Sequence, residues 1–203
     1  MQEKKLTIYQ QQKLAKPIPD DIIPDYLGED LIKTALGFIA WLRENKMAPK
    51  WGPSSANSWT SNYKGKPILQ LHLWEQCQLG NHRDFVDMRS GSQPCWTITP
   101  KLTNMAQYSD IIINEDLQNF ILNNAKSCVY SERNPNFGMD KAPGCNPTKS
   151  CRPGGTITVL NKELKYNCGA FGMLLGNPDE ATLNIIQRLL ELEKKAREKI
   201  GRL

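Results

Sequence analysis

Four of the six cysteines lie in or beside a long segment that is poor in core-forming residues. The segment, residues 128–155, is rich in proline and glycine, and a loop of this length is uncommon in a compact domain unless it is functional, disordered or cross-linked. Four thiolates brought together would form a tetrahedral zinc or iron site and would stabilise a loop that has no core of its own. The candidate metal ligands are Cys128, Cys145, Cys151 and Cys168.

The spacing of these cysteines leaves three interpretations open. Their positions differ by 17, 6 and 17, so they lack the close pair that structural zinc sites usually contain. Metal ligands and buried free thiols are two of the interpretations. The third is redox chemistry, because Lys149 and Arg152 flank Cys145 and Cys151 and would favour the reactive thiolate. A thiol-dependent enzyme or redox-regulated protein is therefore the alternative to a metal-binding protein.

Aromatic residues provide a second candidate site. Tyr63, His72 and Trp74 are expected to share one face of a sheet, where they would line a ligand pocket with His72 as its polar group. The alternative is that strand aromatics simply pack between helix and sheet. No nucleophile–base constellation and no glycine-rich phosphate loop is recognisable, so the sequence favours a small-ligand-binding protein over an enzyme. The full predicted ligand-binding set is Trp59, Tyr63, His72, Trp74 and Trp96.

Hydrophobic periodicity predicts the helices. Leu31, Ala35, Phe38 and Leu42 recur at helical spacing within residues 30–46. A closing helix is expected from Pro178 to residue 200, with Asn177 as its N-cap. Its expected buried stripe is Ile185, Leu189, Leu192, Ala196 and Ile200, and its expected i,i+4 ion pairs are Glu191–Lys195, Glu193–Arg197 and Glu198–Arg202. A third helix is expected over residues 114–128.

Alternation of polar and apolar residues predicts the strands. A hairpin over residues 59–74 turns at Lys64-Gly65-Lys66. Further strands are expected at 84–88 and 94–99, a loop at 75–83, and a second hairpin after residue 155 with its turn near Asn161. Residues 1–28 contain three prolines and predict an extended acidic arm. In the first hairpin Leu69, Leu71 and Leu73 would face the core, and Ile68, Gln70, His72 and Trp74 would face away.

These elements predict a single α+β domain over residues 1–203, with an antiparallel sheet built from hairpins, helices packed on one face and the cysteine-bearing loop as an insert. The net charge of +5 is too weak to indicate a nucleic-acid partner. No apolar run approaches a membrane span and the N-terminus lacks a secretory signal, so a cytoplasmic location is expected. A protein-interaction module that uses the acidic arm or the basic last helix is a further alternative.

Three stretches together resemble a known family. The hairpin "YKGKPILQLHLW" after an N-terminal helix, then "GTITVLNKE" and the closing "LNIIQRLLELEKKARE", resemble the small YdhG-type α+β domains of bacteria. The resemblance covers residues 30–75 and 154–200, and it implies a frataxin-like fold in a family of which some members are proposed to handle iron. The cysteine insert and the segment from 75 to 93 depart from the pattern, and no functional residue is carried over.

Overall fold

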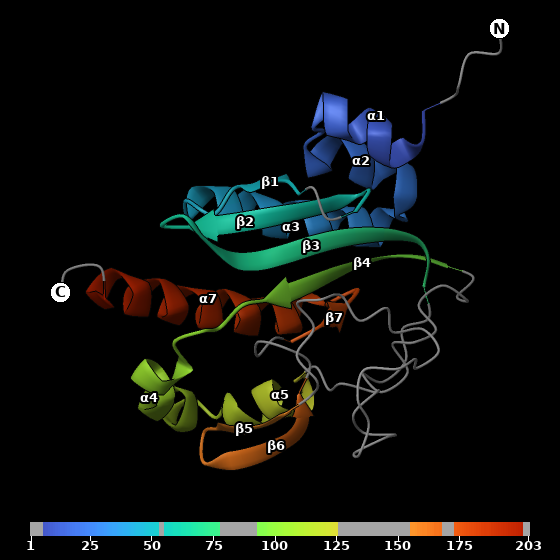
Figure 1. Cartoon of the computed structure of the whole chain (residues 1–203). Coiled ribbons are helices and arrows are strands. Elements are labelled where there is room, and N and C mark those ends of the chain that lie inside the picture. The colour runs from blue at the N-terminus through green and yellow to red at the C-terminus, as the bar shows by residue number, and fades with distance from the viewer. Residues whose placement is uncertain (1–5, 53–54, 78–92, 126–154, 168–172, 201–203) are drawn as a thin grey trace, which may run out of the picture.

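The computed structural model describes residues 6–52, 55–77, 93–125, 155–167 and 173–200 (Figure 1). Its centre is an antiparallel five-stranded sheet of order β1-β2-β3-β4-β7, and β5 and β6 pair as a separate hairpin. The strands are β1 (Pro49–Trp51), β2 (Ser58–Tyr63), β3 (Lys66–Cys77), β4 (Gln93–Pro100), β5 (Gly155–Val159), β6 (Lys162–Asn167) and β7 (Leu175–Gly176).

Helices cover one side of this sheet. Figure 1 shows the two longest helices behind the strands, α3 behind β1 and β2 and α7 behind β4. The predicted α+β class is confirmed. The helices are α1 (Ile8–Ala15), α2 (Pro19–Tyr26), α3 (Glu29–Glu44), α4 (Ser109–Asn114), α5 (Gln118–Asn123) and α7 (Glu180–Ile200), and a 3₁₀ turn, η2 (Met105–Tyr108), precedes α4. None of the helices within the described ranges carries an apolar stretch long enough to cross a membrane.

The core forms where α3 meets the sheet. As the periodicity predicts, Ala35, Phe38 and Leu42 of α3 are buried. The ring of Phe38 packs against Trp96 of β4, with ring centroids 6.2 Å apart and planes tilted by 50°. Trp96 has no exposed surface, so it is a packing residue at this interface.

The β2–β3 hairpin follows its alternating sequence. Lys64 and Gly65 both have positive φ, 49° and 74°, as a two-residue hairpin turn requires. Leu69, Leu71 and Leu73 are buried as predicted. The hairpin also continues further than expected, because β3 runs to residue 77, so residues 75–77 are strand and not the predicted loop.

A register shift in this hairpin decides which side chains share a face. Ser61 pairs with Leu69 but Asn62 pairs with Pro67, so β3 carries one extra residue between them. That residue is Ile68, which is fully buried, and the prediction that it faces away from the core is wrong. The extra residue also places Tyr63 on the helix-covered face, opposite to the face expected for it.

The N-terminal segment is helical, so the predicted extended arm is wrong. Thr7 and Gln10 form a reciprocal capping box that starts α1. Pro19 occupies the first position of α2, where the missing N–H has no intrahelical partner to lose. Ile23 of α2 is completely buried in the core, so packing compensates for Pro24 inside the same helix.

The closing helix starts two residues later than predicted. The side chain of Asp179 accepts the backbone N–H of Thr182 at 2.8 Å, so Asp179 caps the helix. Asn177 instead extends the sheet pairing, because its side-chain oxygen accepts the N–H of Trp96 at 3.0 Å and its own N–H donates to the Trp96 carbonyl at 2.8 Å. The predicted buried stripe holds for Leu189, Leu192 and Ala196, whereas Ile185 is half-buried and Ile200 is 46% exposed.

Of the helix predicted over residues 114–128, only residues 118–123 form a helix in the described structure, as α5, and α4 is an unpredicted helix that ends at residue 114. The two helices are separated at Asp116, whose φ of 53° is incompatible with an α-helix. The preceding run Ile111–Ile113 carries no helical periodicity, and it folds as α4 with only Ile112 fully buried.

Several predictions concern residues outside the described ranges. They include the strand at 84–88, residues 126–128 of the third helix and nearly all of the cysteine-bearing loop. Within the described ranges, strand 94–99 corresponds to β4, and the second hairpin turns at Leu160 and Asn161 as expected. The single-domain organisation over residues 1–203 stays a prediction.

Candidate functional site

The predicted aromatic set does not form one surface. Trp59 and Trp96 are buried, with 1% and 0% of their surfaces exposed, on the helix-covered face. The indole N–H of Trp59 donates to the carbonyl of Pro17 at 2.8 Å, which ties the hairpin to the segment before α2. These two tryptophans belong to the core.

Tyr63 lies on the helix-covered face beside α7. Its hydroxyl donates to the carboxylate of Glu198, and this hydrogen bond is the main reason why the pKa of Tyr63 is raised above its ordinary value. The ammonium of Lys194 lies 5.2 Å from the centroid of the same ring, in the geometry of a cation–π contact.

His72 and Trp74 occupy the opposite face of the sheet. Their rings stack with centroids 5.6 Å apart and an interplanar angle of 19°. The indole N–H of Trp74 donates to the hydroxyl of Thr97 at 3.1 Å, across to β4. The expectation that Tyr63 shares a face with this pair is therefore wrong, and the register shift at Ile68 is the physical reason.

The four predicted metal ligands, Cys128, Cys145, Cys151 and Cys168, lie outside the described residues. In the described part of the chain, no three His, Cys, Asp or Glu side chains are grouped so that they would hold a metal ion. Cys95 of β4 is buried and forms a disulfide bond. All four predicted ligands therefore stay available together only if Cys77 is the second cysteine of that bond.

This disulfide predicts the number of reactive thiols in the unreduced protein. Of six cysteines, two are in this bond, so denatured but unreduced protein is expected to show at most four reactive thiols, and six after reduction. Peptide mapping without reductant would identify the partner of Cys95. A partner among the four predicted ligands would exclude a site that needs all four, and six thiols without reductant would contradict the disulfide itself.

A buried ion pair connects the closing helix to the rest of the fold. The guanidinium of Arg197 donates to the carboxylate of Glu193 at 2.9 Å, and the two residues are only 7% and 0% exposed. Arg197 also donates to the backbone carbonyls of Lys66, Pro67 and Lys101, at 3.1, 3.0 and 3.3 Å. The expected i,i+4 pair is therefore present and buried, and it joins α7 to the hairpin and to the end of β4.

The same carboxylate holds the segment that leads into α4. It accepts the hydroxyl of Tyr108 at 2.8 Å, the backbone N–H of Asn104 at 3.1 Å and the hydroxyl of Thr103 at 3.0 Å. Burial by itself would raise the pKa of Glu193, but hydrogen bonds from Arg197, Tyr108 and Asn104 outweigh it and hold the pKa below its ordinary value. Glu193 is thus ionised and fully bonded, and it fixes η2 against α7.

Between these two elements lies a groove of about 300 Å³, which we call the α4–α7 groove. Leu192, Lys195, Ala196 and Lys199 share one side of α7 because they are three, four and seven residues apart. Leu192 and Ala196 are buried, whereas Lys195 and Lys199 are exposed. The groove is lined by Gln107, Tyr108, Ile111, Leu192, Lys195, Ala196, Glu198 and Lys199.

The composition of the groove suits binding. Its apolar surface comes from Ile111, Leu192 and Ala196. Its charged groups are the ammonium groups of Lys195 and Lys199 and the carboxylate of Glu198, which accepts the hydroxyl of Tyr63, so the net charge of the lining is positive. Among the described residues that line it there is no serine, cysteine or histidine, so they supply no Ser–His or Cys–His pair. Burial, then the adjacent Glu193 carboxylate, raise the pKa of Tyr108 far above its ordinary value, so its hydroxyl stays protonated and bonded to Glu193.

The sequence contains a signal for the burial of Glu193 that its prediction as an i,i+4 pair does not use. Glu193 lies four residues after Leu189 and three after Leu190, directly on the apolar stripe of α7. A charge in that position requires buried partners. The groove has no comparable signal, because η2 and α4 are not predicted and their approach to α7 is a tertiary contact.

No protein-family model, curated protein or solved structure matches this chain. The resemblance to YdhG-type domains accordingly stays a prediction, and the function has to be argued from the site alone.

Proposed function

We propose that this protein binds a small amphipathic anion, such as a medium-chain carboxylate, in the α4–α7 groove. The observation that carries the proposal is the placement of two exposed lysines beside an apolar surface on the same side of α7. Ligand sites are typically concave and mostly apolar, with a few polar groups that fix the orientation of the ligand. The proposed class, a small-ligand-binding protein, agrees with the sequence-based prediction, but the proposed site lies elsewhere.

A bound carboxylate would use both kinds of surface. Each methylene group removed from water contributes about 0.8 kcal/mol, so the chain of an eight-carbon acid would gain from contact with Ile111, Leu192 and Ala196. Its head group would meet Lys195 and Lys199, and lysines bind anions as flexible point charges. The proposal therefore predicts that both chain length and charge matter for affinity.

We expect octanoate to bind saturably in isothermal titration calorimetry, octanol to bind more weakly, and acetate to bind too weakly to detect. The double variant Lys195→Gln/Lys199→Gln should weaken octanoate binding about tenfold, the loss expected for about 1.4 kcal/mol, and leave octanol binding nearly unchanged. Ile111→Gln should weaken the binding of both ligands.

The matched control is Ile113→Gln, which lies on the same helix but does not line the groove and is already 48% exposed. It should bind octanoate like the parent protein. An absence of saturable octanoate binding would contradict the proposal. So would a loss of octanoate affinity in Ile113→Gln equal to that in Ile111→Gln.

The other sequence-based interpretations stay predictions. The metal-binding and thiol-redox interpretations depend on cysteines outside the described ranges. Ligand binding by His72 and Trp74 also stays a prediction. The cytoplasmic location is also a prediction, and the Cys95 disulfide weighs against it, because disulfides are rare in the cytosol.

A further inference from the structure

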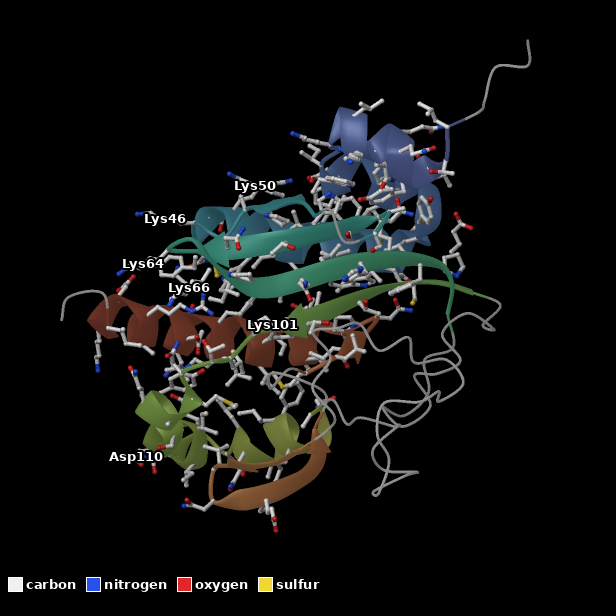
Figure 2. All side chains as sticks on the ribbon, viewed as in Figure 1. Lys46, Lys50, Lys64, Lys66, Lys101 and Asp110 are labelled. Atoms are coloured by element: carbon white, nitrogen blue, oxygen red, sulfur yellow. The ribbon has the colours of Figure 1, made fainter. Side chains whose placement is uncertain are left out.

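Lysines from separate parts of the sequence gather at one end of the sheet. Figure 2 shows Lys46, Lys50, Lys64, Lys66 and Lys101 at the end where the β2–β3 hairpin turns, and Asp110 apart from them on α4. Lys46 follows α3, Lys50 lies in β1, the next two flank Gly65 in the hairpin turn, and the last follows β4. We call these five residues the lysine end.

Little in the described structure neutralises this charge. Lys46, Lys50, Lys64 and Lys66 are exposed, and none of these four forms an ion pair with another described residue. The arginines behave differently, since Arg43, Arg188 and Arg197 each pair with a carboxylate. Lys46, Lys50, Lys64 and Lys66 therefore form a local concentration of positive charge without an ion-pair partner among the described residues.

Lys194 of α7 lies next to one of these lysines. It donates to the backbone carbonyl of Asn45 at 2.7 Å, so it lies against the segment that leads to Lys46. Burial is the main cause that lowers the pKa of Lys194, the carboxylates of Glu198 and Glu191 raise it, and repulsion from Lys46 has a smaller lowering effect.

Two of these lysines lie at turns. Lys64 has a φ of 49° because it lies in the two-residue hairpin turn. Lys46 has a φ of 63° because it lies in the turn that ends α3, where the N–H of Met47 donates to the carbonyl of Leu42 at 2.8 Å. Both side chains are exposed.

We infer that the lysine end binds the phosphate backbone of a nucleic acid without reading its bases. Lysine contacts phosphates as a point charge, whereas base recognition typically uses the bidentate fork of arginine, which this surface lacks among its five residues. Tyr63, the neighbouring aromatic residue, has its hydroxyl bonded to Glu198 and its ring next to Lys194, so it is not an open stacking platform.

A nucleic acid fits this surface better than a lipid bilayer does. The exposed large hydrophobic side chains of the described residues lie in or next to α1, before α2, in α4 and at the end of α7, and none is in the segments that carry the five lysines. Membrane-surface sites usually combine basic residues with apolar side chains that insert between lipids. This inference uses none of the residues that line the α4–α7 groove, so either proposal can fail alone.

The test is fluorescence anisotropy of a labelled random-sequence DNA duplex titrated with the full chain at several salt concentrations. Each phosphate contact contributes about 0.9 to the slope of log affinity against log salt. Lys64→Gln/Lys66→Gln should therefore reduce that slope by about 1.8 and weaken binding at low salt. The second double variant, Lys46→Gln/Lys50→Gln, should have the same effect, so the test does not depend on one variant that could fail to fold. Thermal denaturation verifies that both variants are folded.

The matched control is Lys33→Gln/Lys162→Gln, which removes two exposed charges on α3 and β6 outside the lysine end. It should bind the duplex with the parent slope. An equal loss in this control would mean that net charge alone drives binding and would overturn the inference. So would an absence of duplex binding, or tighter binding of polyglutamate or of phosphatidylserine vesicles than of DNA at equal salt.

Discussion

Glu193→Ala is expected to lower the free energy of unfolding by about 3–5 kcal/mol, the cost of leaving one partner of a buried ion pair without the other. The substitution leaves the buried guanidinium of Arg197, which is 7% exposed, without its carboxylate partner. It also removes the hydrogen-bond acceptor of the Tyr108 hydroxyl and of the Asn104 N–H. Urea denaturation followed by circular dichroism measures the change. A second readout is the α4–α7 groove, which should lose octanoate binding because Glu193 holds η2 against α7.

The matched control is Glu191→Ala on the same helix. Glu191 lies 3.7 Å from Arg188 with 41% of its side chain exposed, and such surface pairs contribute about 1 kcal/mol or less. The replacement of both buried partners, Glu193→Leu/Arg197→Met, should not restore stability, since the carbonyls of Lys66 and Pro67 would lose their donor. A loss of unfolding free energy below 1 kcal/mol for Glu193→Ala would contradict the prediction that this hydrogen-bond network stabilises the fold.

The pH dependence of stability distinguishes the contribution of the Glu193 charge from that of its size. Because its pKa is lowered in the folded state, the stability it contributes is present above the pKa of the unfolded chain, about 4.3, and is lost as the pH falls through the folded pKa. Glu193→Gln keeps the size of the side chain but does not titrate. Its stability, lower at neutral pH, should therefore decline less between pH 6 and pH 3 than that of the parent protein.

Phe38→Ala is expected to cost about 3–5 kcal/mol of unfolding free energy, the range for removal of a buried phenyl ring. Phe38 is 1% exposed, stacks on Trp41 at 5.9 Å and packs against Trp96 at 6.2 Å, so its loss opens a cavity between α3 and β4. Thermal or urea denaturation measures the effect.

Phe38→Leu is the graded control and should cost clearly less, since it retains most of the buried apolar volume. A cost for Phe38→Ala near that of an exposed substitution such as Lys33→Ala would mean that the helix–sheet interface is not the main core. Neither Phe38 variant should change the salt dependence of DNA binding, because Phe38 is not part of the lysine end.

The predictions that succeed rest on local patterns. α3, the β2–β3 hairpin and α7 follow from helical spacing at Ala35, Phe38 and Leu42, from alternation at Leu69, Leu71 and Leu73, and from a long apolar stripe. The predictions that fail involve competition between local signals and packing. Prolines indicate an extended arm before residue 28, yet the burial of Ile23 and the capping box at Thr7 favour two helices.

The candidate sites show the same difference between what local sequence patterns predict and what tertiary packing decides. One extra residue in β3, Ile68, separates Tyr63 from His72 and Trp74, and no pattern in the sequence marks it. The ion pair Glu193–Arg197 is recognisable as an i,i+4 pair, but its burial is decided by Tyr108 and by backbone carbonyls distant in sequence. The groove forms only where η2 and α4 meet α7.

The sequence by itself determines the α+β class, the long helices and the central hairpin, because periodicity and turn chemistry act over a few neighbouring residues. The tertiary structure alone decides which charges meet. A net charge of +5 spread over 203 residues indicates no partner, but the fold brings Lys46, Lys50, Lys64, Lys66 and Lys101 to one end of the sheet and leaves the first four of these without an ion pair among the described residues. Electrostatic attraction depends on distance in space, and chain order does not encode that distance.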